Sequence, residues 1–297
     1  MHLIVLAAIF ALAWGLRFTW TENNRLNWLD SSEERLRQRW SLTLSKFLLP
    51  PLLLLTTSIA IIWMGPHGRM VWVGNDWLSY NLAIGCLGVA GLYLLKLTCS
   101  GWQMLQQVRT YPTTKLGGKK VRILNLSIPY IAQIGFWQPE LVITQGLLDN
   151  LGTEHLAAVL AHEQAHYRYR DPWCFFWLGW VRQITIWLPQ TEAMWQELLV
   201  LRELRADRWA SKQTDPLLVA EALLLVVQNT ELFTEKFCVG FSQIAPPDRL
   251  TQRINALLEI SELTNAPTQR FRKLTDFWEW GWLLVGFLPL LTVLFHQ

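Results

Sequence analysis

The chain has 297 residues, of which 52% are hydrophobic and only 16% are charged. This composition excludes a typical soluble globular protein and favours a membrane protein. The formal net charge of +3 is small and the basic residues are scattered, which argues against direct nucleic-acid binding. The 18 Trp residues fit the aromatic belts found at membrane–water interfaces.

Four apolar runs approach the ~17–25 residues that cross a bilayer as a helix. In chain order they cover residues 3–20, 47–64, 78–97 and 278–295. The first run has no Lys or Arg ahead of its apolar core, so we expect an uncleaved span rather than a signal peptide. Segment 21–46 is rich in Arg, whereas the loop after the second run carries Arg69 alone. The positive-inside rule therefore predicts an external amino terminus and a basic cytoplasmic loop at 21–46.

Residues 1–97 are thus predicted to form three transmembrane helices, 98–277 a cytoplasmic domain, and 278–297 a fourth transmembrane helix. Within the cytoplasmic domain, residues 114–144 alternate apolar and polar residues between Gly, Pro and Asn, which predicts a small β-sheet. The sequence IGFWQPELVIT within it resembles a hairpin that ends in a strand. Thr153 is then predicted to cap a helix that ends before Pro172.

This helix contains the sequence VLAHEQAHYRYRDP, in which His162 and His166 are four residues apart and Glu163 follows the first histidine. Histidines at this spacing share one helix face, so both imidazoles can bind one ion while Glu163 stays free to act as a base. The alternative is a polar helix that contains two histidines by chance. In a chain with only six His, a chance match to the HExxH zinc motif is improbable.

Catalytic zinc needs three protein ligands and one open position. The third ligand is predicted in LVLRELRADRWAS, a helical segment where Glu203 and Asp207 share a face. Glu203 would complete the metal site, and Asp207 would hold the second ring nitrogen of a histidine. The alternative is that Glu203 pairs with Arg202 or Arg205 on a solvated face.

HExxH followed by ExxAD on a later helix resembles the gluzincin metalloproteases. With SIPYIAQIGFWQPELVITQGLL before the zinc helix, Asp171 after it and PPDRLTQRINALL beyond Glu203, the chain is similar to the BlaR/MecR family of membrane antirepressor proteases. The resemblance covers residues 124–258 closely. It implies an α-helical membrane protein with an α+β zincin-like cytoplasmic metalloprotease domain. The chain departs from the family in lacking an external penicillin-binding domain, so we do not expect a β-lactam signal.

The family implies a Zn²⁺-dependent endopeptidase in the inner membrane of a bacterium, which responds to an external or membrane signal. Its substrate would be a cytoplasmic winged-helix repressor of the BlaI type, and a homodimer is one candidate assembly. Zinc would lower the pKa of water toward ~7, and Glu163 would accept the proton. Arg249 and Arg253 would either help with the oxyanion or serve as structural ion-pair residues.

Two rival functions stay open. Quality-control proteases of the HtpX type resemble the chain in length and motif, but they carry two spans between HExxH and the third ligand. Here that interval contains 172–189, which we predict to be one helix lying against the membrane or packed in the core. A receptor with purely structural zinc is the second rival, although structural zinc sites usually have four Cys or His ligands.

The sequence WMGPHGRM after the second run suggests a signal. Met64 and Met70 flank His67, and thioether and imidazole ligands together suit soft ions such as Cu(I). The alternative is that Met64 merely ends a span and His67 is an ordinary loop residue.

Overall fold

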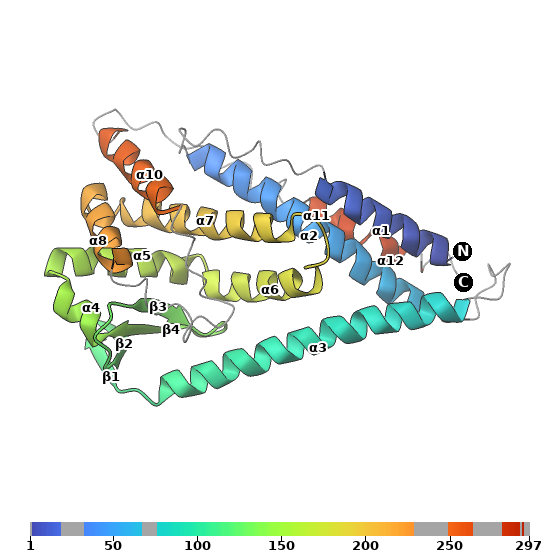
Figure 1. Ribbon diagram of the computed structural model, residues 1–297, viewed down its shortest axis with the longest axis horizontal. Helices are drawn as coiled ribbons and strands as arrows, with labels where there is room; N and C mark the ends of the chain where they lie inside the picture. The colour runs from blue at the N-terminus through green and yellow to red at the C-terminus, as the bar shows by residue number, and fades with distance from the viewer. Residues whose placement is uncertain are drawn as a thin grey trace.

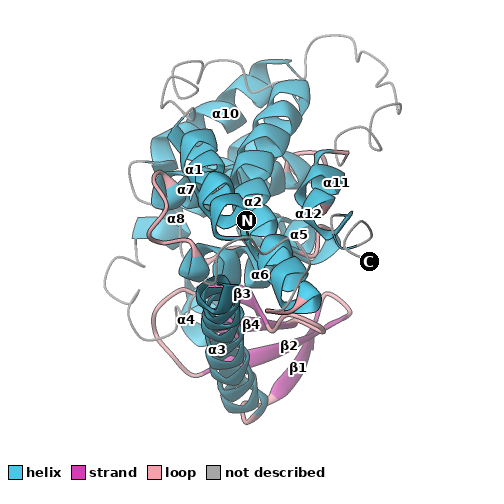
Figure 2. Ribbon diagram, turned by 90° about the vertical axis from the view of Figure 1, so that its right-hand side faces the viewer, coloured by secondary structure: helices cyan, strands magenta, loops and turns pink. Residues whose placement is uncertain are grey.

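The computed structural model describes residues 2–18, 33–66, 76–228, 249–263, 281–291 and 293. These residues form an elongated molecule in which the described chain ends lie together at one end of the long axis (Figure 1). A four-stranded sheet lies toward the other end, on one side of a stack of helices (Figures 1 and 2). The fold is therefore mostly helical with a small mixed sheet, as predicted.

The end that contains the chain termini is a bundle of helices around α2. The helices are α1 (His2–Phe18), α2 (Glu33–Met64), α3 (Asp76–Arg109), α11 (Trp282–Gly286) and α12 (Leu288–Leu291). Helix α2 packs against each of the other four. It is therefore the central element of this end of the molecule (Figure 1).

Two helices in the described part of the chain are long and apolar enough to cross a membrane, judged by length and composition. They are α2 and the stretch Trp77–Arg109 of α3. Four spans were predicted. Helix α1 is apolar but has only 17 residues, about 26 Å at 1.5 Å per residue, against a hydrocarbon core of about 30 Å.

The last predicted span is not one continuous helix where it is described. Helices α11 and α12 are separated at Phe287, whose backbone N–H bonds to Leu284 O at 3.1 Å. Pro289 explains the break, because proline has no N–H for the oxygen four residues earlier and its ring clashes with that carbonyl. The described part of the run is largely helical, but apolar composition does not predict its interruption.

The predicted basic loop at 21–46 is helical from Glu33 onward, where it is described. Glu33 and Glu34 lie in the first turn of α2, where negative charge is favourable, and Glu33 pairs with Arg37 at 3.0 Å. Similarly, α3 continues past the predicted boundary at residue 98 to Arg109. Both membrane-length helices therefore extend well into the part of the molecule that contains the HExxH motif.

The sheet has the strand order β1-β2-β4-β3. Its strands are β1 (Thr113–Leu116), β2 (Lys119–Leu124), β3 (Ile131–Ile134) and β4 (Glu140–Thr144). Strands β2 and β4 are parallel, and the other two pairs are antiparallel. The predicted hairpin is confirmed, since β3 pairs with β4 from Ile131 opposite Ile143 to Ile134 opposite Glu140.

Both faces of the sheet are covered by helices. Side chains alternate along a strand, so Leu141 and Ile143 of β4 face one core and Val142 faces another. The first core includes residues of α5 and α8, and the second includes Val108 near the end of α3. The sheet therefore links α3 to the helix that carries HExxH.

The remaining described helices are α4 (Gln145–Asn150), α5 (Thr153–Arg168), α6 (Asp171–Ile184), α7 (Thr191–Ala210), α8 (Pro216–Gln228) and α10 (Leu250–Leu263). The predicted cap of α5 is wrong by one residue, because Gly152 occupies the cap position and Thr153 is the first helical residue. The end of α5 before Pro172 is confirmed, and Pro172 lies in the first turn of α6, where its missing N–H costs nothing.

Helix α6 is packed in the protein, which is one of the two predicted alternatives. Phe175 and Leu178 are buried with residues of α2 and α7 in a single core. On another side, the Trp180 indole donates a hydrogen bond of 2.8 Å to the backbone oxygen of Ala90 in α3. Helix α6 therefore fills the space between α3 and the pair α2–α7 (Figure 1).

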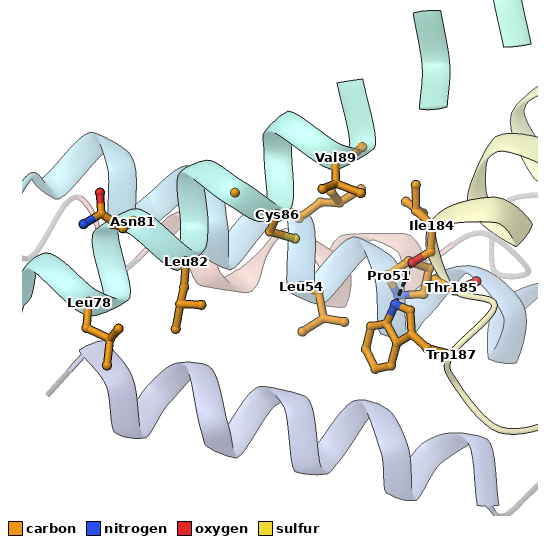
Figure 3. A pocket seen from close by; sticks show the side chains of 13 residues that line it. Pro51, Leu54, Leu78, Asn81, Leu82, Cys86, Val89, Ile184, Thr185 and Trp187 are labelled. Atoms are coloured by element: carbon orange, nitrogen blue, oxygen red, sulfur yellow. Dashed lines mark hydrogen bonds between the residues drawn. The ribbon is translucent and has the colours of Figure 1, made fainter. Parts of the chain in front are cut away.

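An apolar pocket of about 430 Å³ lies between α2, α3 and the turn after α6. Leu54, Leu82 and Val89 are among its lining residues, and Trp187 lies at one end with its indole bonded to Ile184 O at 2.8 Å (Figure 3). The pocket adjoins the turn that precedes α7, whereas Glu203 lies in the second half of α7. The pocket is therefore separate from the HExxH motif and Glu203.

Gly146 gives a test of this architecture. A Cβ atom there would lie 2.0 Å from the backbone oxygen of Ser127, and the amide of Gly146 already bonds to Leu126 O at 2.8 Å. We expect Gly146→Ala to lower the free energy of unfolding by about 3 kcal/mol or more, because backbone must move. Gly91→Ala in α3 is the control, since nothing lies within 4 Å of its Cβ position. Thermal unfolding in detergent should show a lower midpoint for the first variant only; equal midpoints would contradict the packing described.

Candidate metal centre

The two histidines of HExxH lie on one face of α5. Their Nε2 atoms are 3.1 Å apart, and the two rings are nearly perpendicular at an interplanar angle of 82°. The four-residue spacing produces this pairing, since it corresponds to about one helical turn. His162 and His166 therefore direct one nitrogen each toward a common point.

Glu203 reaches the same point from α7. Its Oε2 lies 3.3 Å from His162 Nε2, and its Oε1 lies 3.7 Å from His166 Nε2. The three donor atoms lie within 4.8 Å of one another. Two ligands of one tetrahedral zinc ion, each bonded at about 2.0–2.1 Å, are about 3.3 Å apart. The spacing and the donor types, two imidazoles and one carboxylate, therefore fit a zinc ion with a fourth position left open.

The other ring nitrogen of each histidine is held by a carboxylate. His162 Nδ1 lies 2.8 Å from Asp207 Oδ1, and His166 Nδ1 lies 2.8 Å from Asp171 Oδ2. Such partners fix the ring orientation and make the metal-facing nitrogen more basic. The position of Asp207 agrees with the expectation from its spacing to Glu203. The role of Asp171 was missed, although it lies five residues after His166 at the start of the next helix.

Arginines neutralise the buried carboxylates. Arg253 on α10 donates two hydrogen bonds of 2.7 Å to Asp207 and lies 3.3 Å from Glu203 Oε2. Arg202 contacts Glu203 at 2.7 Å, which is the pairing considered as an alternative to metal binding. This ion pair and metal binding are compatible, because Glu203 is buried and its oxygens face both the arginines and the histidines.

Arg249 lies elsewhere. It contacts Glu197 on α7 at 3.4 Å, and Glu197 also pairs with Arg39 of α2. The structure therefore brings Arg253 next to the metal ligands and places Arg249 in a separate ion-pair cluster. Glu163 is buried beside His162 on α5.

The comparisons with known proteins agree with this geometry. Residues 130–228 match the sequence model of Peptidase family M48. The M48-like segment runs from the strand β3 to the end of α8 and contains all three metal donors together with Asp171 and Asp207. No curated protein and no solved structure matches the chain.

The match supports a metallopeptidase, and M48 peptidases are zinc-dependent. This is the coarser part of the predicted resemblance, namely a gluzincin-type protease. The match does not separate the BlaR/MecR family from other proteases of this type, so that assignment stays a prediction. It covers neither the long helices α2 and α3 nor Arg253.

The M48-like centre is strongly charged. Burial alone would raise the pKa of Glu203, but Arg202, His166 and Arg253 hold it well below its usual range. Burial likewise opposes ionisation of Asp207, and Arg253 and His162 nevertheless lower its pKa. Burial lowers the pKa of Arg253, whereas Asp207, Glu203 and Glu163 together raise it. Both carboxylates are therefore ionised, so Glu203 can bind metal and Asp207 can orient His162.

Of the predicted signal-metal residues, Met64 is the last residue of α2, while His67 and Met70 lie outside the described residues. The copper hypothesis therefore stays a prediction from the sequence.

The charge at His162 gives a pH prediction for the metal-free chain. Burial disfavours the imidazolium, but Asp207 and Glu203 outweigh burial and raise the pKa of His162 to about 10. A raised pKa stabilises the folded state fully below the unfolded value of about 6.5, and this stabilisation is lost as pH rises through about 10. The thermal midpoint of the chelator-treated protein should therefore fall across this interval, and less so in His162→Gln. Identical slopes in both proteins would contradict the assigned protonation.

Proposed function

We propose that this chain is a zinc-dependent metalloendopeptidase, anchored in the inner membrane of a bacterium by α2 and α3, that cleaves a cytoplasmic repressor of the BlaI type. The observation that carries the enzymatic part is the convergence of His162, His166 and Glu203, with the second nitrogen of each histidine already bonded to a carboxylate. An arrangement fixed in advance in this way needs little rearrangement to bind metal.

The chain supplies the groups that peptide hydrolysis needs. Zinc, when bound, provides a Lewis acid that polarises a carbonyl and makes water more acidic near neutral pH. Glu163 accepts the proton of the attacking water and delivers it to the departing amine. Its place next to His162, on the buried face of α5, suits this role. Arg253 keeps Glu203 and Asp207 ionised throughout, because it contacts both carboxylates.

Strand β3 offers a place for an extended substrate. It is an edge strand of the four-stranded sheet, next to β4 only, and it contacts α5. A peptide that adds to such an edge gains backbone hydrogen bonds without a requirement for particular side chains. This supports an endopeptidase that accepts an unfolded or exposed segment of a protein.

The connection between HExxH and Glu203 favours the regulatory protease over the HtpX-like one. In the described structure a single 14-residue helix, α6, joins α5 to α7, and no pair of spans is inserted there. The three-donor site with one free position favours catalysis over the purely structural zinc of a non-proteolytic receptor. The repressor substrate itself is proposed from the resemblance of residues 124–258 to the BlaR/MecR proteases.

Glu163→Gln tests this proposal, because it should bind zinc but lose the base. We expect cells that carry it to accumulate one small winged-helix repressor, with target genes turned down, relative to the parent. Purified Glu163→Gln should cleave that repressor at least about 100-fold more slowly than the parent protein does. Glu154→Gln is the matched control, since Glu154 is exposed in the first turn of the same helix.

The other outcomes are equally informative. Accumulation of many membrane proteins in the Glu163→Gln cells would replace the repressor proposal with quality control. Identical proteomes, in cells where zinc binding by the parent has been measured, would favour the non-proteolytic receptor.

A further inference from the structure

We propose that Arg205 is a positioning residue for the metal centre and that Trp40 of α2 holds Arg205 in place. The inference rests on the proposed zinc site and adds its regulation: helix α2, which is long and apolar enough to cross a membrane, would set how firmly the metal is bound. Neither residue contacts a metal donor directly. The effect of Arg205 would pass through the carboxylate of Asp171.

Asp171 is shared between the centre and Arg205. Its Oδ2 lies 2.8 Å from His166 Nδ1, and its Oδ1 accepts a hydrogen bond from the Arg205 guanidinium. The Asp171 side chain is only 3% exposed, so its orientation depends on these two partners rather than on solvent. If Arg205 is removed, the carboxylate loses a charged partner in a buried place and is free to turn away from His166.

The Arg205 guanidinium itself lies over two aromatic rings. Its Cζ atom lies 4.2 Å from the ring centroid of Tyr169 and 4.6 Å from that of Trp40. A planar guanidinium can stack between two rings while it donates sideways to a carboxylate, and an ammonium group cannot do both. Tyr169 follows α5 directly, whereas Trp40 belongs to α2. The membrane-length helix α2 therefore supplies one of the two rings that contact Arg205.

A second contact of Trp40 leads to the third metal donor. The Trp40 and Phe175 rings are 6.2 Å apart, and the Cζ atom of Arg202 lies 4.8 Å from the Phe175 ring. Arg202 in turn contacts Glu203 at 2.7 Å. Trp40 therefore contacts Arg205 directly and is linked to Arg202 through the Phe175 ring.

Trp40 and the apolar part of α2 belong to one helix. Trp40 lies about 36 Å along the helix axis from Met64, and Pro50 and Pro51 lie in the stretch between them, where each removes a backbone donor. Arg39, the neighbour of Trp40, is also anchored to α7 by its ion pair with Glu197. Helix α2 is therefore tied to α7, the helix that carries Glu203, by an ion pair of the residue next to Trp40.

The test is the zinc affinity of the full-length protein in detergent, measured by competition with a chromophoric chelator. Arg205→Ala should weaken Zn²⁺ binding about tenfold or more, and Trp40→Ala about fivefold. In the Arg205→Ala background, Trp40→Ala should add less than about twofold, because its direct contact is with Arg205 and the route through Phe175 and Arg202 is indirect. Arg205→Lys should restore only part of the affinity, and Trp40→Phe most of it.

Two matched variants control for lost charge and lost aromatic surface. Arg168→Ala removes an exposed arginine at the end of α5, and Trp63→Ala removes an exposed tryptophan at the far end of α2. Both should bind Zn²⁺ like the parent. The thermal midpoint of each metal-free variant shows whether it is folded. If Arg205→Ala is not folded, the zinc affinities of Arg205→Lys and Trp40→Phe test the positioning role.

The result separates this inference from the proposed function. A parent protein that does not bind Zn²⁺ overturns the metal site itself. A parent that binds, together with folded Arg205 and Trp40 variants of unchanged affinity, overturns only the positioning role. Independent, fully additive losses would show that Trp40 does not act through Arg205.

Discussion

The burial of negative charge along α7 is the constraint on which the rest of the structure depends. Glu197, Glu203 and Asp207 are all buried on this one helix. A buried ion that loses its partner costs about 3–5 kcal/mol, so each carboxylate needs a cation close by. The cations come from three different helices, namely Arg39 from α2, Arg202 from α7 and Arg253 from α10. Helices α2 and α10 must therefore dock on α7 for the centre to exist at all.

This arrangement explains how a reactive centre is compatible with a stable fold. The carboxylate of Asp207 serves Arg253 and His162 at once, and that of Asp171 serves Arg205 and His166. Each acid is thus neutralised from outside the centre while it orients an imidazole inside it. The ion pairs hold the packing together, and the same contacts keep the donors in place.

Local patterns allowed much of the fold and the centre of the site to be predicted. The four-residue spacing of His162 and His166, and of Glu203 and Asp207, fixes their relative positions within one helix, whatever the rest of the chain does. The alternation of apolar and polar residues in 114–144 likewise predicts a small sheet. Such signals depend on neighbouring residues alone, which is why they are readable in a single sequence.

The features that were missed depend on contacts between distant segments. Asp171 and Arg205 are 34 residues apart, and nothing in either neighbourhood shows that they pair. The basic residues before the second apolar run indicate a cytoplasmic loop, because Lys and Arg mark topology. From Glu33 onward the segment is helical instead, and this helix docks against α7 through contacts such as that of Arg39 with Glu197. Cap choice at Gly152 and the break before Pro289 are details that propensity does not resolve.

The length of α3 has a geometric consequence. Its 34 residues extend about 51 Å, of which the apolar run 78–97 accounts for about 30 Å, the thickness of a hydrocarbon core. On the proposed topology, the remaining 12 residues stand at most about 18 Å beyond that core and end where Val108 packs against the sheet. On that topology, α3 would set the distance between the sheet and the bilayer, because the sheet packs on the end of this helix.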